Sequence, residues 1–353
     1  MNVLQVMTQP SKSMIDKVGT VPAALAVGYV GYKLLRTVWH GCHFILAHTL
    51  PGKDLAKSYK LINDMTTTNT RTKTTQEGSY IVISGTTNKG IGYAFAQEFA
   101  AAGFSLVLIG RGQEKLEAIA TELKRNTPYC IDVKCLELLD LGNLGGTQES
   151  TAVVNQLLET VQELDIAGVV HAAGMETIST QFSNLSMDKN RMAINLNATT
   201  PVLLTQALLP KLTDRVHQKL AKRSMVIFVG AGAGLRPSPC LNVYAATKSL
   251  INFFSQALSV EFATSLDVLV THPLGVATAM VDEQPDGLIM ITPQQCAHAS
   301  LRQLGGAWGQ QWTNGWFFHE IQWSIMSRLP DVVYHNFFRM IIRKMEAIKN
   351  KKK

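Results

Sequence analysis

The sequence predicts an α/β fold, a doubly wound parallel sheet with helices on both faces. Two observations predict it. Between residues 79 and 271, short apolar runs alternate with longer stretches of helical periodicity, the pattern of strand–helix–strand units. The first apolar run also ends in a glycine-rich turn that opens a helical stretch, the layout of a dinucleotide-binding site.

Length and composition limit the number of domains and the kinds of partner to be expected. The 353 residues are enough for one large domain with appendages or for two small domains. Hydrophobic residues make up 46% and charged residues 17%, a balance that favours contact with a membrane. No basic stripe carries interleaved aromatic residues, so nucleic acid is not expected as a partner. The five cysteines lack metal-ligand spacing, which indicates reduced thiols in a cytosol-facing protein.

The first 62 residues are expected to form an N-terminal region with a membrane anchor. The run from residue 18 to 32 carries no charge, although it is shorter than the roughly 20 residues of a simple span. Lys33 and Arg36 follow it and could snorkel to the bilayer surface. A buried or interfacial helical hairpin is the alternative. Residues 63–78, which are polar and rich in threonine, are expected to be a linker.

The main domain is expected to span residues 79–300. Its apolar runs predict strands, and the periodic stretches between them predict helices. The strands are expected at 79–85, 104–110, 132–139, 166–170, 225–229 and 267–271. The helices are expected at 93–102, 113–124, 151–164, 184–212 and 242–258. Residues 301–353 are expected to form a helical extension near the substrate or the membrane, with a basic tail.

The turn after the first strand carries the features of a Rossmann-type nucleotide site. Gly85, Gly90 and Gly92 would let the backbone approach a pyrophosphate. The helix expected at 93–102 would offer unpaired N–H groups to the same phosphates, and Ile91, between the last two glycines, is expected to contact the cofactor. A plain strand–turn–helix unit would account for one glycine but not for three. Lys89 either bulges out of the turn or contacts a phosphate.

Arg111 ends the second strand, where the adenine ribose of the cofactor is discriminated. An acidic residue there would bind the ribose 2′-hydroxyl, whereas an arginine accommodates a 2′-phosphate. No acidic residue lies between the end of this strand and Glu114, so NADPH is predicted, and a solvated surface arginine is the alternative. Asp140, at the end of the third strand, would either bond the adenine amino group or cap the next turn.

Tyr244 and Lys248 lie four residues apart in a predicted helix and therefore share one face. A phenol titrates near pH ~10, and a neighbouring ammonium group favours the phenolate and lowers that pKa. Such a pair can exchange a proton with a carbonyl or alcohol oxygen near neutral pH. Beside a nucleotide site, the pair is predicted to be catalytic.

Taken in order, the glycine turn, the turn from His171 to Gly174, Asn195 and the Tyr244–Lys248 pair resemble the short-chain dehydrogenase/reductase family. The resemblance runs from about residue 79 to residue 278. Finer marks resemble its branch of very-long-chain 3-oxoacyl-CoA reductases and microsomal hydroxysteroid dehydrogenases. These marks are the segments 237–239 (PSP), 272–278 (HPLGVAT) and 313–319 (TNGWFFH).

The resemblance assigns roles to single residues. Tyr244 would protonate the substrate oxygen, and Lys248 would bind the nicotinamide ribose and lower the pKa of the tyrosine. Asn195 would hold a helix bend and a water of the proton relay. The remaining cofactor contacts would be Val276 and Thr278 at the nicotinamide carboxamide, and Ala172 and Gly174 along the adenine ribose.

The function implied is NADPH-dependent reduction of 3-oxoacyl-CoA to 3-hydroxyacyl-CoA in very-long-chain fatty-acid elongation. One position departs from the family pattern, because the serine expected thirteen residues before the tyrosine is Ala231. Loss of a polarising donor lowers a rate by about two to three powers of ten. The alternatives are a hydroxysteroid dehydrogenase with the same machinery, and a catalytically impaired paralogue that binds NADPH and acts as a scaffold.

The tail places Lys351 and Lys349 third and fifth from the end, which resembles a dilysine retrieval signal. Together with the apolar N-terminal run, it implies an endoplasmic-reticulum membrane protein whose catalytic domain faces the cytosol. The expected partners are an acyl-CoA or another lipid and the membrane. A second copy of the chain or a fatty-acid elongation complex is a further expected partner.

Overall fold

The computed structural model describes residues 48–62, 78–129, 131–138, 147–178, 181–278, 285–306 and 312–351, together with residues 29, 31–32, 35, 38, 41–42 and 45–46. The chain divides into two compact units, Met1–Pro51 and Gly52–Lys353. The second unit holds the sheet, its helices and every candidate site residue that the structure describes.

The predicted doubly wound parallel sheet is confirmed. Seven strands lie in the order β3-β2-β1-β4-β5-β6-β9, so the direction of winding reverses between β1 and β4. In such sheets ligands bind at the carboxyl edge beside this switch point. The strands are β1 (Tyr80–Ser84), β2 (Ser105–Gly110), β3 (Val133–Glu137), β4 (Ile166–His171), β5 (Ser224–Val229), β6 (Leu266–Thr271) and β9 (Trp312–Thr313). A separate parallel pair is formed by β7 (Gly275–Val276) and β8 (Met290–Ile291).

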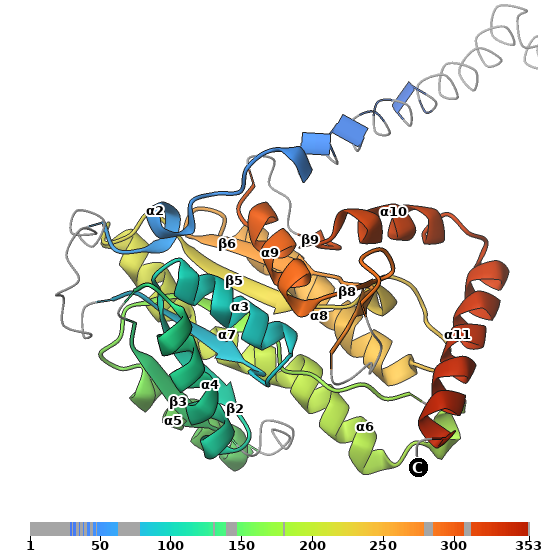
Figure 1. Cartoon of the computed structure of the whole chain (residues 1–353), viewed down its shortest axis with the longest axis horizontal. Coiled ribbons are helices and arrows are strands. Elements are labelled where there is room, and N and C mark those ends of the chain that lie inside the picture. Colours follow the sequence, from blue (N-terminus) through green and yellow to red (C-terminus); the bar gives the residue numbers. More distant parts are fainter. Residues whose placement is uncertain are drawn as a thin grey trace, which may run out of the picture. The chain divides into compact units, whose positions relative to one another are not determined.

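Helices cover both faces of the sheet (Figure 1). One face is covered by α3 (Ile91–Ala101), α4 (Gln113–Asn126) and α9 (Pro293–Gln303). The other face is covered by α5 (Thr147–Thr160), α7 (Thr200–His217) and α8 (Asn242–Glu261). The remaining helices are α2 (Leu55–Tyr59), α6 (Met187–Ile194), α10 (Phe317–Met326) and α11 (Asp331–Lys351).

Successive strand residues contribute to two separate hydrophobic cores. Along β1, Ile81 and Ile83 point into the core under α3 and α4, whereas Tyr80 and Val82 point into the core under α7 and α8. Because both faces of the central strands are buried, their residues are mostly apolar and do not alternate with polar ones, whereas the edge strand β3 (VKCLE) carries the half-buried Lys134 and Glu137. This is why uninterrupted apolar runs located the strands to within one or two residues at most ends.

The C-terminal extension supplies a strand as well as helices. Trp312 and Thr313 pair with Val270 and Thr271, which makes β9 the edge strand next to β6. The boundary placed at residue 300 falls inside α9. The helices predicted for the extension are α10 and α11.

Residues 52–62, which the sequence assigned to the N-terminal region, pack on the sheet unit. The side chain of Tyr59 is fully buried in the core beside α3, and its hydroxyl donates to Asp267 Oδ2 (2.7 Å). Leu61 forms an antiparallel bridge with Ala221. The compact unit therefore begins at Gly52.

The described residues from Tyr29 to Thr49 in the first unit are helical. Within the part of the chain that the structure describes, no helix combines the length and the apolar character that a membrane span needs. Most of the predicted anchor at 18–32 and of the predicted linker at 63–78 lies outside the described residues. Both stay predictions.

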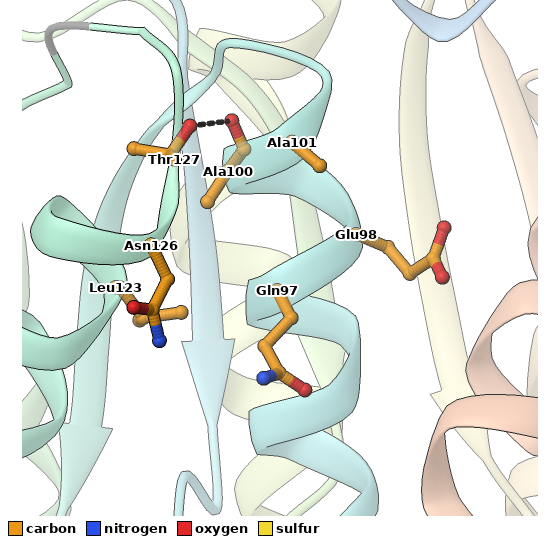
Figure 2. A pocket seen from close by; sticks show the side chains of 7 residues that line it. All are labelled: Gln97, Glu98, Ala100, Ala101, Leu123, Asn126 and Thr127. Atoms are coloured by element: carbon orange, nitrogen blue, oxygen red, sulfur yellow. Dashed lines mark hydrogen bonds between the residues drawn. The ribbon is translucent and has the colours of Figure 1, made fainter.

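A hollow of about 270 Å³ opens between α3 and α4 (Figure 2). Gln97 and Ala101 of α3 and Leu123 and Asn126 of α4 are among the residues that line it. These residues belong to the C-terminal halves of helices that start at the carboxyl edge of the sheet. The hollow therefore lies toward the amino edge, away from the glycine turn.

Candidate active site

The turn after β1 is built for close backbone contact. Gly85 has a φ of +79°, and a Cβ there would lie 2.3 Å from the backbone nitrogen of Ala173, so a larger residue does not fit. A Cβ on Gly92 would lie 2.7 Å from the carbonyl oxygen of Gly85. The N-terminal turn of α3 thus packs directly on the end of β1, as a dinucleotide turn requires. Ala172 lies at the same place, and its N–H donates to the Ser84 carbonyl (3.1 Å).

Lys89 and Gly90 complete this turn. The Gly90 N–H donates to the Thr87 carbonyl (2.9 Å), and Lys89 between them has a left-handed φ of +63°. The lysine side chain is exposed, and its contact with a phosphate stays a prediction. Gly90 is the N-cap of α3, and within the described chain no side chain caps this helix. The first N–H groups of α3, beginning with Ile91, thus face the turn, where an anion would bind.

Arg111 directly follows β2 and is exposed. Glu137, at the end of β3, is not among the residues that the sequence singled out. Its Oε1 accepts from the N–H groups of Gly112 (2.8 Å) and Gln113 (3.2 Å) and so caps α4. This carboxylate is engaged in the cap, and Arg111 is the charged side chain at the end of β2. Asp140 lies outside the described residues.

α8 carries Tyr244 and Lys248 on one face at the carboxyl edge of the sheet. Lys248 is 5% exposed, and its Nζ donates to the Val229 carbonyl at the end of β5 (2.7 Å). The same nitrogen lies 5.7 Å from the centre of the Tyr244 ring. Gly234, after β5, allows this close packing, because a Cβ there would lie 2.7 Å from Lys248 Cβ. The structure thus brings the predicted pair together.

The pKa of Tyr244 does not follow the prediction. Burial and, second, the nearby Glu176 carboxylate raise this pKa, whereas the sequence argument expected Lys248 to lower it. Burial also lowers the pKa of Lys248, to about 8. The prediction was wrong for the protein alone because desolvation of the two groups outweighs their attraction. The ammonium group is also hydrogen-bonded to a backbone carbonyl.

Asn195 begins a π-helical segment, Asn195–Thr199, between α6 and α7. The Thr200 N–H donates to the Asn195 carbonyl across this wider turn. Short π-helical segments bend the helices that contain them and are frequent at functional sites. The helix irregularity therefore lies where the resemblance expects a bend, and the Asn195 side chain is buried beside it.

Asn197, two residues further on, was missed by the sequence reasoning. Its Oδ1 accepts from the Met175 N–H (2.8 Å), and its Nδ2 donates to the Met175 carbonyl (2.8 Å) and to Thr247 Oγ1 (3.2 Å). It thereby fastens the loop after β4 to α8. Gly174 lies between these parts, because a Cβ there would be 3.2 Å from Asn197 Oδ1 and 3.5 Å from Lys248 Nζ. Asn197 is a positioning residue of the site.

Ala231 stands where the family has its serine. It directly follows the residue after β5, has an extended backbone (φ −164°, ψ 148°) and is 8% exposed. Its methyl group cannot polarise a carbonyl. Ser238 does not take over this role, because its hydroxyl bonds the Ala233 carbonyl (3.0 Å) and the Tyr334 hydroxyl (3.2 Å).

Val276 and Thr278 lie on and just after β7. Val276 is buried in a small apolar cluster with Ile291 of β8, and Ile91 packs against this cluster. Thr278 is partly buried. The structure thus places Val276 near the start of α3, as expected for residues that contact one cofactor.

The C-terminal helix α11 packs beside Tyr244. Cys240, Leu241 and Ile342 form a buried apolar cluster, and Tyr244 and Phe338 pack against it. Ile342 and Phe338 belong to α11. The surroundings of the tyrosine are apolar on this side.

Arg236 holds α11 in this position. Its guanidinium group lies 4.2 Å from the centre of the Tyr334 ring, donates to the Met326 carbonyl (2.6 Å) and pairs with Asp331. A single arginine therefore joins the loop before α8 to the end of α10 and the start of α11.

Residues 79–288 match the family model described as short chain dehydrogenase. The chain belongs to this family. This confirms the predicted class, a nicotinamide-dependent oxidoreductase, and the predicted family resemblance.

Several curated relatives belong to the predicted branch. A very-long-chain 3-oxoacyl-CoA reductase from Homo sapiens is 26% identical over 264 residues, which cover 73% of this chain and 77% of the relative. A hydroxysteroid dehydrogenase-like protein 1 from Gallus gallus is 25% identical over 344 residues, which cover 94% and 92%. A protein from Homo sapiens named inactive hydroxysteroid dehydrogenase-like protein 1 is 26% identical over 264 residues, which cover 72% and 74%.

Solved structures share the fold. A structure of a 7β-hydroxysteroid dehydrogenase has a TM-score of 0.61 at 22% identity and covers 74% of this chain and 96% of its own. A short-chain dehydrogenase from Sphingobium yanoikuyae, solved in complex with NADPH, has a TM-score of 0.55 at 22% identity and covers 72% and 97%.

Proposed function

We propose that this chain is an NADPH-dependent reductase that converts 3-oxoacyl-CoA to 3-hydroxyacyl-CoA in fatty-acid elongation. The observation that carries the proposal is the placement of Tyr244 and Lys248 on one face of α8, at the carboxyl edge of the sheet. Relatives named very-long-chain 3-oxoacyl-CoA reductase support this choice of substrate.

The residues at the switch point suit a nicotinamide dinucleotide. Gly85 and Gly92 leave room for the backbone to approach a pyrophosphate, and the start of α3 offers N–H groups. Arg111 would bind the 2′-phosphate of NADPH through its exposed guanidinium group. When bound, the cofactor supplies a hydride to the keto carbon of the substrate. The other contacts proposed are Lys248, Val276 and Thr278 at the nicotinamide end, and Asp140, Ala172 and Gly174 at the adenosine end.

Tyr244 would donate the proton to the substrate oxygen. Its raised pKa keeps the phenol protonated at neutral pH, so the hydroxyl is a donor before the reaction. The phenolate left after proton transfer would be stabilised by the Lys248 ammonium group, whose attraction acts once the tyrosine is charged. A water beside Asn195 would then return a proton through Lys248.

The apolar cluster beside Tyr244 supports a lipid substrate. Phe338 and Ile342 of α11 would adjoin the part of the substrate next to its carbonyl. An acyl chain suits this environment, and a hydroxysteroid, the alternative substrate class, suits it as well.

Ala231 favours a second function. Without a hydroxyl at this position, the chain would bind NADPH and act as a scaffold or subunit in fatty-acid elongation, with no hydride transfer. One similar protein is named inactive hydroxysteroid dehydrogenase-like protein 1.

The proposed place of action is the endoplasmic-reticulum membrane, with the catalytic domain on the cytosolic side. The dilysine-like tail with Lys349 and Lys351 and the uncharged run at 18–32 support this. The proposed partners are the membrane and either a second copy of the chain or an elongation complex.

The test is NADPH oxidation by the detergent-solubilised full chain with a long-chain 3-oxoacyl-CoA. The native chain is expected to react slowly, and Tyr244→Phe is expected to abolish the reaction while NADPH binding persists. Ala231→Ser is expected to raise the rate by about two to three powers of ten, because it restores a polarising donor.

Two other results would change the conclusion. A native chain that is inert but becomes active as Ala231→Ser would establish an intact cofactor site without catalysis, the second function. If all three proteins bind NADPH and none oxidises it, reduction of this substrate class is refuted.

A further inference from the structure

α10 is fastened to the turn before β8 by three side chains from one side of the helix. Trp316, His319 and Gln322 are spaced by three residues and therefore lie next to one another along the helix surface. Each bonds a backbone carbonyl of the same short turn. The pairs are Trp316 Nε1 with the Gly287 carbonyl (3.1 Å), Gln322 Nε2 with the Leu288 carbonyl (2.9 Å) and His319 Nε2 with the Ile289 carbonyl (3.1 Å).

His319 has a second bond, to a different segment. The Leu274 N–H donates to His319 Nδ1 (3.3 Å), so this nitrogen carries no proton. The Ile289 carbonyl can only accept, so Nε2 carries the proton. The side chain is fully buried, and burial lowers its pKa, which favours this neutral form. His319 is therefore a neutral bridge with one donor and one acceptor.

The two ends of this bridge lie at the two strands of the small sheet. Leu274 directly precedes β7, and Ile289 directly precedes β8. The strands are paired, and the Ala277 N–H donates to the Ile291 carbonyl (2.8 Å) at their far end. His319 thus closes the near end of the β7–β8 pair.

Hydrogen bonds within the turn at 286–290 fix its shape, so α10 contacts a turn that does not depend on the helix for its conformation. The Asp286 carboxylate accepts from the N–H groups of Leu288 (2.8 Å), Ile289 (2.8 Å) and Met290 (2.9 Å). Trp316 also packs against the apolar cluster that contains Val276. Because the turn at 286–290 and α10 are each rigid and are bonded to one another, the position of α10 determines the position of β7.

We propose that His319 is a positioning residue for the nicotinamide half of the cofactor, because its bridge between Leu274 and Ile289 fixes β7 and with it Val276. The inference rests on the proposed function, in which Val276 contacts the nicotinamide. His319 itself touches neither the substrate nor the reacting atoms. It acts through the strand that it holds.

The test compares two ligands on the detergent-solubilised full chain. NADPH occupies both halves of the site, whereas 2′,5′-ADP occupies only the adenosine half at the glycine turn and Arg111. His319→Phe removes both bonds of the bridge and is expected to weaken NADPH roughly tenfold or more. The affinity for 2′,5′-ADP is expected to change less than twofold.

Three variants accompany this measurement. His319→Gln keeps a donor and an acceptor and is expected to recover part of the NADPH affinity. Gln322→Leu removes only the solvent-exposed bond to the Leu288 carbonyl and is expected to give a smaller loss with the same selectivity. His298→Phe makes the same exchange on α9 and is the matched control.

The outcomes separate this inference from the proposed function. Equal weakening of both ligands in His319→Phe and Gln322→Leu would overturn the positioning role, as would unchanged NADPH affinity in both variants. A native chain that binds neither ligand would refute the proposed cofactor site and the inference together.

Discussion

Acid is expected to destabilise this protein through two buried histidines at the carboxyl edge of the sheet. His171 is 5% exposed, lies 2.9 Å from Thr205 Oγ1 through its Nε2, and stacks on Phe228 with ring centres 5.0 Å apart. His272 is fully buried, and its Nε2 lies 2.9 Å from Asn252 Oδ1. Burial lowers the pKa of each imidazole to about 3.

The sign and size of the effect follow from these pKa values. An unfolded histidine titrates near pH ~6.5, so the unfolded chain binds more protons than the folded chain below that pH. Stability is therefore lost as the pH falls from about 6.5 toward the folded pKa of about 3. Proton linkage gives a loss of about 2 kcal/mol per histidine between pH 7 and pH 5, and about 4 kcal/mol for the pair. This is a large part of the roughly 5–15 kcal/mol of a typical domain.

Urea unfolding of the full chain in detergent, followed by tryptophan fluorescence at pH 7 and pH 5, measures this loss. His171→Gln and His272→Gln are each expected to reduce the loss by about 2 kcal/mol, because glutamine does not titrate. His298→Gln is the control, since this histidine lies on α9 with its side chain 63% exposed. If the native chain and both buried-site variants lose the same free energy on acidification, these histidines are not neutral in the folded protein and the reasoning is refuted.

Two further predictions concern the cofactor site. Arg111→Ala is expected to raise the KM for NADPH by about one to two powers of ten and to leave the KM for NADH unchanged, because a charged hydrogen bond to the 2′-phosphate contributes roughly 1.5–3 kcal/mol. Steady-state kinetics with both cofactors check this, and an equal effect on both would speak against the arginine as the discriminating residue. Asn197→Leu is expected to lower the free energy of unfolding by about 2–4 kcal/mol, because it leaves the Met175 backbone groups without a partner. Urea unfolding at pH 7 checks this against Asn126→Leu at the exposed end of α4, and equal losses in both variants would contradict it.

The strands and helices between residues 79 and 271 could be predicted because each carries enough residues to show a period. The apolar run at 225–229 corresponds to Ser224–Val229, and the periodic stretch at 242–258 begins α8 at Asn242. β9 could not be predicted, because two residues carry no pattern and their pairing with β6 is a tertiary contact.

Side-chain roles were predictable where the chemistry is local and not where it depends on a distant partner. Tyr244 and Lys248 share a face by helix geometry alone, yet the rise in the pKa of Tyr244 depends on burial that no spacing reveals. Asn197 lies two residues after Asn195, and the sequence cannot show which of the two asparagines binds Met175. Tertiary contacts determine both the pKa of Tyr244 and the choice of asparagine.

Two sequence marks of the family branch prove to be a single structural unit. The His272 N–H donates to the Thr313 carbonyl (2.6 Å), and Asn314 Nδ2 donates to the His272 carbonyl (2.8 Å). The segments 272–278 and 313–319 lie far apart in the sequence, so this connection was not foreseen. It also brings His319 to Leu274.

The edge strand β9 has a consequence for how the protein is made. β6 is complete at Thr271, whereas its outer neighbour is supplied by Trp312 and Thr313. A ribosome adds roughly 5–20 residues per second, so the part of the β6 edge that β9 covers, Val270 and Thr271, stays unpaired for on the order of a few seconds during synthesis. Exposed strand edges pair with other chains, which makes the nascent protein vulnerable to aggregation in that interval. A chain that stops before Trp312 would keep this vulnerability for its whole lifetime.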